Sequence, residues 1–173
     1  DQRFYAPRSL PELTRLRAAY PRSTILAGGT DVCLSVTKQF RALGDIVFTG
    51  QVAELKEVRE KAGMLHIGAG VSLNDSYAEL AKYYPQLTGI WERFASVPIR
   101  NAGTLGGNVA NGSPIGDSMP GLIALGARVV LCNNARSRVL PMEDLYVAYR
   151  QTAMQADEVV VAVEVPLPSP ALQ

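Results

Sequence analysis

Two glycine-rich stretches hold the residue types in this sequence that could do chemistry. In the first, "ILAGGTDV", Gly28 and Gly29 precede Thr30 and Asp31. Glycines let the chain turn sharply and leave successive amide N–H groups unshielded, and such groups can cradle an anion, most often phosphate. A plain tight turn, with Thr30 or Asp31 capping the next element, fits the same pattern. The stretch is not a Rossmann fingerprint, which needs a third glycine and an acidic residue after the next strand.

The second stretch, "RNAGTLGGNVANGSPIGDSMP", is more specific. "TLGGN" combines the hydroxyl of Thr104, two glycines and the amide of Asn108, and "NGSPIGD" repeats this chemistry and ends on Asp117. Two such loops could hold a diphosphate and the polyol beside it, because a buried diphosphate needs many hydrogen-bond donors. Asp117 suits sugar hydroxyls as an acceptor. The alternative is a long surface loop, but the apolar residues within the stretch indicate that it is anchored.

Other reactive side chains are few and scattered. The one histidine, His66, alternates with apolar neighbours, so we expect a solvent-facing strand residue rather than a catalytic base. Cys33 and Cys132 stand in apolar stretches, which favours free buried thiols in a reducing compartment over a disulfide. The sequence offers no catalytic residue and no metal site. If the chain belongs to an enzyme, a bound organic cofactor should carry the chemistry.

The amino-acid composition limits the classes of partner that the chain could bind. The formal net charge is +1 and the basic residues form no block, which argues against nucleic-acid binding and against a basic membrane patch. No apolar run approaches the roughly 20 residues of a membrane span, and no signal-peptide pattern is present. We therefore expect a cytoplasmic protein. The linker-like ending "PLPSPALQ" and the absence of an initial Met indicate a piece of a longer polypeptide.

The first part of the chain, residues 1–59, is expected to form a small lobe. "SLPELTRLRAAY" predicts a helix with Ser9 and Glu12 as a capping box and Pro11 in its first turn. "RSTILAGG" and "DIVFTGQV" predict strands. "TDVCLSVTKQF" fits a short helix or an extended segment, and "AELKEV" fits a turn or a short strand.

Residues 60–173 are expected to form a larger lobe. Two strands should meet around 61–63, a helix capped by Ser72 and Asp75 should end at Pro85, and "LTGIWERFASV" should continue as a second helix. A helix closing on Gly126 should precede a strand in "ARVVLCN" and a turn at 133–134. "DEVVVAVEVP" has the composition of a strand covered on both faces. The result is an α+β fold with both glycine stretches at junctions, where ligands tend to bind.

The two motifs, in this order, resemble those of the FAD-binding domain of the molybdenum hydroxylases, with a strong likeness to the small subunits of bacterial xanthine dehydrogenases. "TGQVAELKEV", "IGAGVSLND" and "AYRQTAMQADEVVVAVEVP" also follow the family's order, so the resemblance covers essentially the whole chain. It implies a fold of the vanillyl-alcohol-oxidase (PCMH) type, in which two α/β lobes clasp FAD.

The resemblance also implies which residues bind FAD. The first loop would wrap the diphosphate, and "TLGGN" would contact the diphosphate and the ribityl chain. An acidic residue after "SPIG", an aromatic ahead of "TLGGN" and a hydrophobic residue after "YRQT" would complete the site. The corresponding residues here are Ile25, Leu26, Ala27, Gly28, Gly29, Thr30, Asp31, Val32, Phe94, Thr104, Leu105, Gly106, Gly107, Asn108, Asp117 and Met154, with Ala153 as the neighbour to which the last register could slip.

The activity implied by the resemblance is electron transfer. Electrons would pass from iron–sulfur clusters through FAD to NAD⁺, with an iron–sulfur domain and a molybdopterin-binding subunit as partners that carry those other cofactors. The sequence lacks the family's cluster cysteines and the lysine of its C-terminal extension. Two alternatives stay open: the FAD subunit of a carbon monoxide dehydrogenase or other N-heterocycle hydroxylase, and a cofactor-free docking module.

Overall fold

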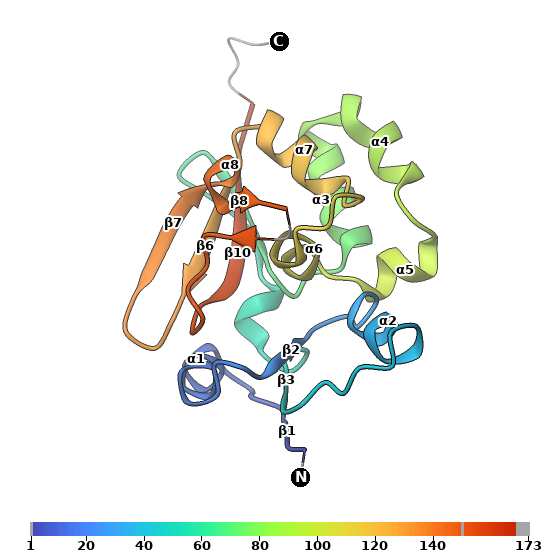
Figure 1. The fold of residues 1–173 in the computed structure, drawn as a ribbon. Coiled ribbons are helices and arrows are strands. Elements are labelled where there is room, and N and C mark those ends of the chain that lie inside the picture. Colours follow the sequence, from blue (N-terminus) through green and yellow to red (C-terminus); the bar gives the residue numbers. More distant parts are fainter. Residues whose placement is uncertain (1, 150, 169–173) are drawn as a thin grey trace.

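The computed structural model describes residues 2–149 and 151–168, whose strands form two main sheets (Figure 1). The strands near the N-terminus form a parallel sheet in the order β1-β3-β2, and an antiparallel sheet lies beyond it in the chain, in the order β4-β5-β10-β6-β7. Strands β8 and β9 form a separate antiparallel pair. The strands are β1 (Phe4–Tyr5), β2 (Thr24–Leu26), β3 (Ile46–Phe48), β4 (Val58–Lys61), β5 (Met64–Gly68), β6 (Arg128–Cys132), β7 (Ser137–Pro141), β8 (Tyr146–Ala148), β9 (Gln151–Thr152) and β10 (Val159–Pro166).

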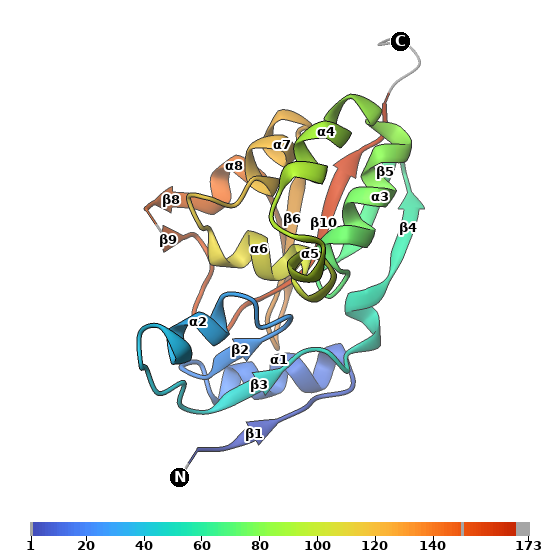
Figure 2. The same ribbon diagram turned by 90° about the vertical axis from the view of Figure 1, so that its right-hand side faces the viewer.

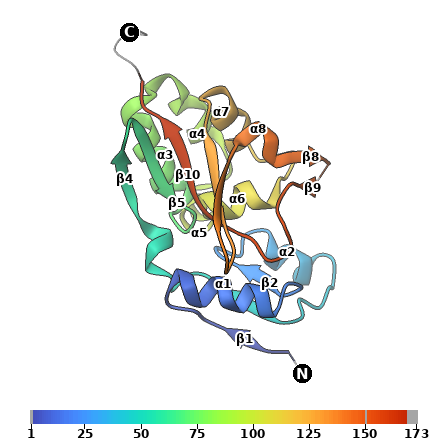
Figure 3. The same ribbon diagram turned by 90° about the vertical axis from the view of Figure 1, so that its left-hand side faces the viewer.

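The helices form two groups, one beside each of the two main sheets. The helices α1 and α2 accompany the small parallel sheet, whereas α3 to α7 lie on one side of the five-stranded sheet (Figures 1 and 2). Figure 3 views the molecule from the side opposite to that of Figure 2, with the large sheet in front of those helices. The helices are α1 (Leu10–Ala19), α2 (Val32–Thr37), α3 (Leu73–Tyr83), α4 (Thr88–Arg93), α5 (Val97–Ala102), α6 (Leu105–Asn111), α7 (Ser118–Ala124) and α8 (Met142–Leu145), with 3-10 turns η1 (Ala53–Lys56) and η2 (Pro85–Leu87). The observed fold is the α+β class that the sequence predicts.

The helix caps agree closely with the sequence. The Ser9 hydroxyl accepts a hydrogen bond from the Glu12 amide, and the Ser72 hydroxyl accepts one from the Asp75 amide at 3.0 Å. Each bond satisfies one of the amides that an α-helix leaves unpaired at its start. The carboxylate of Glu12 reaches the amide of Arg8, one residue before the position that a capping box uses. These caps fix where α1 and α3 begin.

The core lies between the large sheet and its helices. Strand β10 occupies the middle of that sheet and pairs with β5 and β6. Its residues are mostly buried, and Glu164 is the half-buried exception that carries a charge. The expected hairpin around 61–63 is confirmed, because β4 and β5 pair antiparallel across a turn with positive φ at Ala62 and Gly63. The expected turn at 133–134 likewise joins β6 to β7.

Two segments differ from the sequence expectation, and two others take one of the forms that the sequence left open. The segment after Asp31 is the helix α2, and "AELKEV" forms the 3-10 turn η1 before β4 begins. The helix expected over "LTGIWERFASV" ends at Arg93, since Phe94 is extended and Ala95 has φ +50°. The "TLGGN" segment is the start of α6, where the Thr104 hydroxyl caps the helix by accepting from the amide of Gly107. Short strands β1, β8 and β9 carry no sequence signal.

For two side chains, those of Cys33 and His66, the burial in the structure differs from the burial that the sequence predicts. Cys33 is a free thiol but is exposed on α2, because this short helix presents none of its residues to the core. Cys132 is free and partly buried. His66 lies on the sheet face away from the helices, yet its side chain is only 13% exposed because neighbouring strands flank it and Glu164 lies 3.6 Å from its Nδ1. Burial lowers the pKa of His66 and so favours its neutral form.

No helix within residues 2–149 and 151–168 combines the length and the apolar character needed to cross a membrane.

The strands up to Phe48 belong to the small sheet, and those from Val58 onward belong to the larger sheet or to the β8–β9 pair. The division into lobes at residues 59 and 60 stays a prediction.

Candidate functional site

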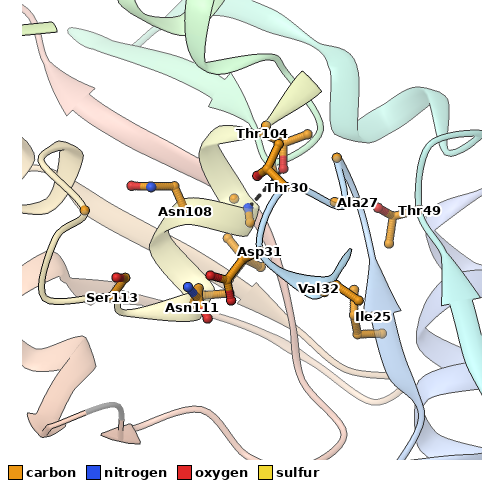
Figure 4. A pocket seen from close by; sticks show the side chains of 18 of the residues that line it. Ile25, Ala27, Thr30, Asp31, Val32, Thr49, Thr104, Asn108, Asn111 and Ser113 are labelled. Carbon is orange, nitrogen blue, oxygen red and sulfur yellow. Dashed lines mark hydrogen bonds between the residues drawn. The ribbon is translucent and has the colours of Figure 1, made fainter. Parts of the chain in front are cut away.

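A cavity of about 760 Å³ lies between the segment that joins β2 to α2 and the helices α5 and α6 (Figure 4). Clefts of about 300–1,000 Å³ commonly hold organic ligands in proteins. Most of the residues that the sequence indicates line this cavity: Ile25, Ala27, Gly28, Gly29, Thr30, Asp31, Val32, Phe94, Thr104, Gly106, Gly107, Asn108, Asp117 and Met154. Leu26 and Leu105 are not among the lining residues, and Leu105 is fully buried in the core.

The first glycine stretch connects β2 to α2 and forms one wall of the cavity. Gly29 has φ +73°, a left-handed conformation that glycine adopts without strain, and it turns the chain into α2. Within the described part of the chain, no hydrogen bond is donated by the amides of Gly28, Gly29 and Thr30. Unpaired main-chain amides are costly unless water or a ligand accepts from them. These three amides are therefore available to a ligand in the cavity, and their role as an anion cradle stays a prediction.

The second glycine stretch differs from that prediction. The amides of Leu105 and Gly106 donate to the carbonyls of Val71 and Ala69, and the amides of Gly107 and Asn108 donate to the side chain and the carbonyl of Thr104. These bonds dock the first turn of α6 onto the segment after β5. The amides of residues 105–108 are consequently in use within the protein, so this turn can contribute to a ligand site through its side chains.

Two side chains of α6 can still serve the cavity. The Thr104 hydroxyl accepts from Gly107 at 3.1 Å and keeps its own proton for donation. The Oδ1 atom of Asn108 is buried and has no hydrogen-bond partner among residues 2–149 and 151–168. A buried acceptor without a partner needs a donor from elsewhere, such as water or a ligand. Thr104 and Asn108 are labelled in Figure 4, together with Thr30 from the opposite wall.

Asp117 precedes α7 and is held in place by a buried neighbour. It is exposed, and its carboxylate makes no capping bond to α7. The next residue, Ser118, is 1% exposed, and its hydroxyl lies 2.6 Å from the hydroxyl of Tyr77. Burial raises the pKa of Tyr77, so this hydroxyl stays protonated. Among the residues that the structure describes, no donor pairs with the Asp117 carboxylate, so it can accept hydrogen bonds from a ligand.

Several lining residues had no separate signal in the sequence. Arg17 comes from α1, and burial lowers the pKa of its guanidinium. Glu158 lies just before β10; its carboxylate is almost fully buried and accepts from Arg138 Nε at 2.6 Å and from the Gln155 amide at 2.7 Å. The bond with Arg138 holds the pKa of Glu158 below its ordinary value. This ion pair orders the loop that carries Met154 on the cavity wall.

The cavity has few charged groups of its own. Its lining includes Arg17, Asp31, Asp117 and Glu158 as charged residues, and no lysine, within the part of the chain that the structure describes. In the same residues, no three His, Cys, Asp or Glu side chains converge as a metal site would require. An anion bound here would depend mainly on neutral N–H and O–H donors rather than on a salt bridge.

The sequence of the chain matches a known protein family over nearly its whole length. Residues 1–168 match the family described as the FAD binding domain in molybdopterin dehydrogenase. The chain belongs to this family. The family's cofactor is FAD, and the cavity fits such a dinucleotide: free amides lie on one wall, and the unpartnered Asn108 Oδ1 lies on the other.

Individual relatives agree with this assignment. The chain is 32% identical over 98% of its length to a nicotinate hydroxylase from Emericella nidulans and 31% identical over 92% to a xanthine dehydrogenase from Drosophila subobscura. Among solved structures, the quinoline 2-oxidoreductase of Pseudomonas putida matches 98% of the chain with a TM-score of 0.90 and 29% identity. The chain spans 14% and 13% of the two relatives and 60% of that solved chain.

Proposed function

We propose that this chain is the flavin module of a xanthine dehydrogenase-like molybdenum hydroxylase, an FAD-dependent oxidoreductase. In this role it receives electrons from iron–sulfur clusters and passes them to NAD⁺. The proposal is supported by membership of the FAD-binding family and by the likeness to xanthine dehydrogenase. The observation on which it depends most is the wall of unpaired amides at Gly28, Gly29 and Thr30 in a cavity of sufficient size.

The residues would divide the work of binding according to their chemistry. The amides of Gly28, Gly29 and Thr30 would donate to the diphosphate, and the hydroxyls of Thr30 and Thr104 would add neutral donors. Asn108 and Asp117 suit the ribose and ribityl hydroxyls, which can both donate and accept hydrogen bonds.

Apolar residues would hold the planar rings. Phe94 and Met154 line the cavity from different elements, Phe94 after α4 and Met154 before β10. Bound FAD supplies the redox chemistry, so the chain itself needs to bind the cofactor, orient it and keep water away. No side chain of this chain is assigned a role as acid or base.

The remaining functions would belong to other parts of the enzyme. The iron–sulfur domain and the molybdopterin-binding subunit would be its partners, since the chain spans only part of its relatives. The small lobe (1–59) and the larger lobe (60–173) would close on FAD from two sides. A cytoplasmic location is included in the proposal because both cysteines are free thiols.

A second candidate differs in the reducing substrate. The relatives include proteins named for nicotinate and quinoline, both nitrogen heterocycles, at identities similar to that of xanthine dehydrogenase. A hydroxylase of such a heterocycle is therefore the alternative. The flavin site would be the same in both cases.

Two measurements test the proposal. The purified chain should turn yellow with FAD, quench the flavin fluorescence on binding and release FAD when denatured; a colourless chain that ignores added FAD would contradict the flavin role. The holoenzyme should then be assayed with xanthine and with nicotinate while NADH formation is measured. NADH formed with xanthine supports the first candidate, and turnover of nicotinate alone supports the second.

A further inference from the structure

The turn between α4 and α5 forms a wall of the cavity. Phe94 and Ala95 both line it, at the point where α4 has ended and α5 has not yet begun. Ala95 has φ +50°, a left-handed conformation that costs free energy for a residue with a Cβ. Such a conformation persists only where the surroundings enforce it, so some group must hold this turn.

The group that holds the turn is the side chain of Arg100. Its NH1 atom donates to the carbonyls of Glu92 at 3.1 Å, Phe94 at 2.6 Å and Ala95 at 3.1 Å. Arg100 is 9% exposed, and within residues 2–149 and 151–168 no carboxylate lies within ion-pair distance of it. A guanidinium is costly to bury and needs acceptors. These three carbonyls supply them.

The ring of Phe94 is supported from behind by aromatic packing. Tyr77 of α3 stacks on Trp91 at 5.4 Å between ring centroids and meets Phe94 edge-on at 6.3 Å and 88°. This contact restrains the ring, whereas Arg100 restrains the backbone that carries it. Neither Arg100 nor Tyr77 lines the cavity itself.

We infer that Arg100 is a positioning residue for the cofactor cavity: it clamps the α4–α5 turn so that Phe94 and Ala95 present a fixed wall to the bound dinucleotide. This inference rests on the proposed function, because the wall has a role only if FAD occupies the cavity. The inference gives the buried Arg100 a role in FAD binding, although Arg100 does not line the cavity.

A double-mutant cycle separates this role from general stability. The dissociation constant for FAD is measured by flavin fluorescence for the wild type, Arg100→Met, Phe94→Ala and the double variant. Arg100→Met should weaken binding about tenfold, but in the Phe94→Ala background it should add less than about twofold, because the residue that it positions is already gone. Arg93→Met is the matched control, since Arg93 is exposed on the same segment, and it should bind FAD as the wild type does.

Folding is checked without FAD through the emission of Trp91, the only tryptophan of the chain, which is 2% exposed. If Arg100→Met alters that emission, Arg100→Lys replaces it in the cycle, because its ammonium keeps the charge and can still donate to part of the turn. Equal losses from the arginine substitution in both backgrounds, or none in the wild-type background, overturn the role of Arg100. Absence of FAD binding by the wild type overturns the proposed function as well.

Discussion

Gly28 lies directly against the backbone of Ala102. A Cβ placed on Gly28 would overlap the carbonyl oxygen of Ala102 at the end of α5. The loop between β2 and α2 therefore touches the end of α5 through bare main chain, next to the unpaired amides of the first glycine stretch. The sequence predicts that Gly28 allows close approach of a ligand, and the structure adds close approach of the α5 backbone.

Gly28→Ala should push this loop away from α5. We expect a loss of about 1–3 kcal/mol in the free energy of unfolding, as for an overpacked core, together with weaker FAD binding. Gly89→Ala is the control, because nothing lies within 4 Å of a Cβ at Gly89 in α4 and the helix should gain up to about 1 kcal/mol. Urea unfolding checks both; a Gly28→Ala chain as stable as the wild type would show that the loop and α5 do not pack as described.

The two glycines of "TLGGN" should respond differently to substitution. A Cβ on Gly106 would overlap the Cβ of Ala69 in the core, so Gly106→Ala should cost about 1–3 kcal/mol of stability. Gly107 lines the cavity, and a Cβ there meets the Thr104 hydroxyl at 2.9 Å and Ala27 at 3.9 Å. Gly107→Val should therefore fill part of the cavity and displace the Thr104 hydroxyl, which removes FAD binding while the core of the fold remains. Thermal unfolding and flavin titration on both variants distinguish the effects, and unchanged FAD affinity in Gly107→Val would remove this loop from the site.

Asp117→Ala should weaken FAD binding by about 1–3 kcal/mol if its carboxylate accepts hydrogen bonds from buried hydroxyls. The fold should not change, because Asp117 is exposed and makes no capping bond. Asp144→Ala, on the exposed side of α8, removes the same charge away from the cavity and serves as the control. Calorimetric titration with FAD gives both affinities; equal values would exclude Asp117 from binding.

The Arg138–Glu158 pair should make stability depend on pH. Because Arg138 lowers the pKa of Glu158, the folded carboxylate stays charged at pH values where the unfolded one binds a proton. The stabilisation is complete above the unfolded pKa, about 4.3, and is lost as the pH falls through the folded pKa. Glu158→Gln should cost on the order of 3 kcal/mol at pH 7, and this difference should shrink as the pH falls toward about 3. A difference in unfolding free energy that stays constant with pH would contradict the assignment.

The helix caps and glycine turns were predicted correctly, because they depend on residues that are close together in the sequence. Ser9 and Ser72 cap their helices as expected, and Gly126 comes just after α7 with φ +67°. The residues of "AGGTDV" all line the cavity. In each of these cases the residues that decide the conformation are neighbours along the chain.

The errors concern residues whose role depends on distant partners. The sequence predicts a loop at Thr104, but its hydroxyl caps α6 and the amides after it pair with the segment near Ala69. Phe94 follows the end of α4, and its carbonyl accepts a hydrogen bond from Arg100, six residues further along the chain. Arg17 reaches the cavity only because α1 packs beside β3. Tertiary packing of this kind leaves no periodic pattern in the sequence.

The most direct test of the flavin site is an NMR titration of the ¹⁵N-labelled chain with FAD. The amides of Gly28, Gly29 and Thr30 have no acceptor within the described residues, so their proton signals should shift strongly and their exchange with water should slow when FAD binds. The amides of Leu105 and Gly106 already donate within the protein and should change little. If FAD binds and the signals of Gly28, Gly29 and Thr30 stay unchanged, the first glycine stretch does not bind the diphosphate and the central claim is wrong.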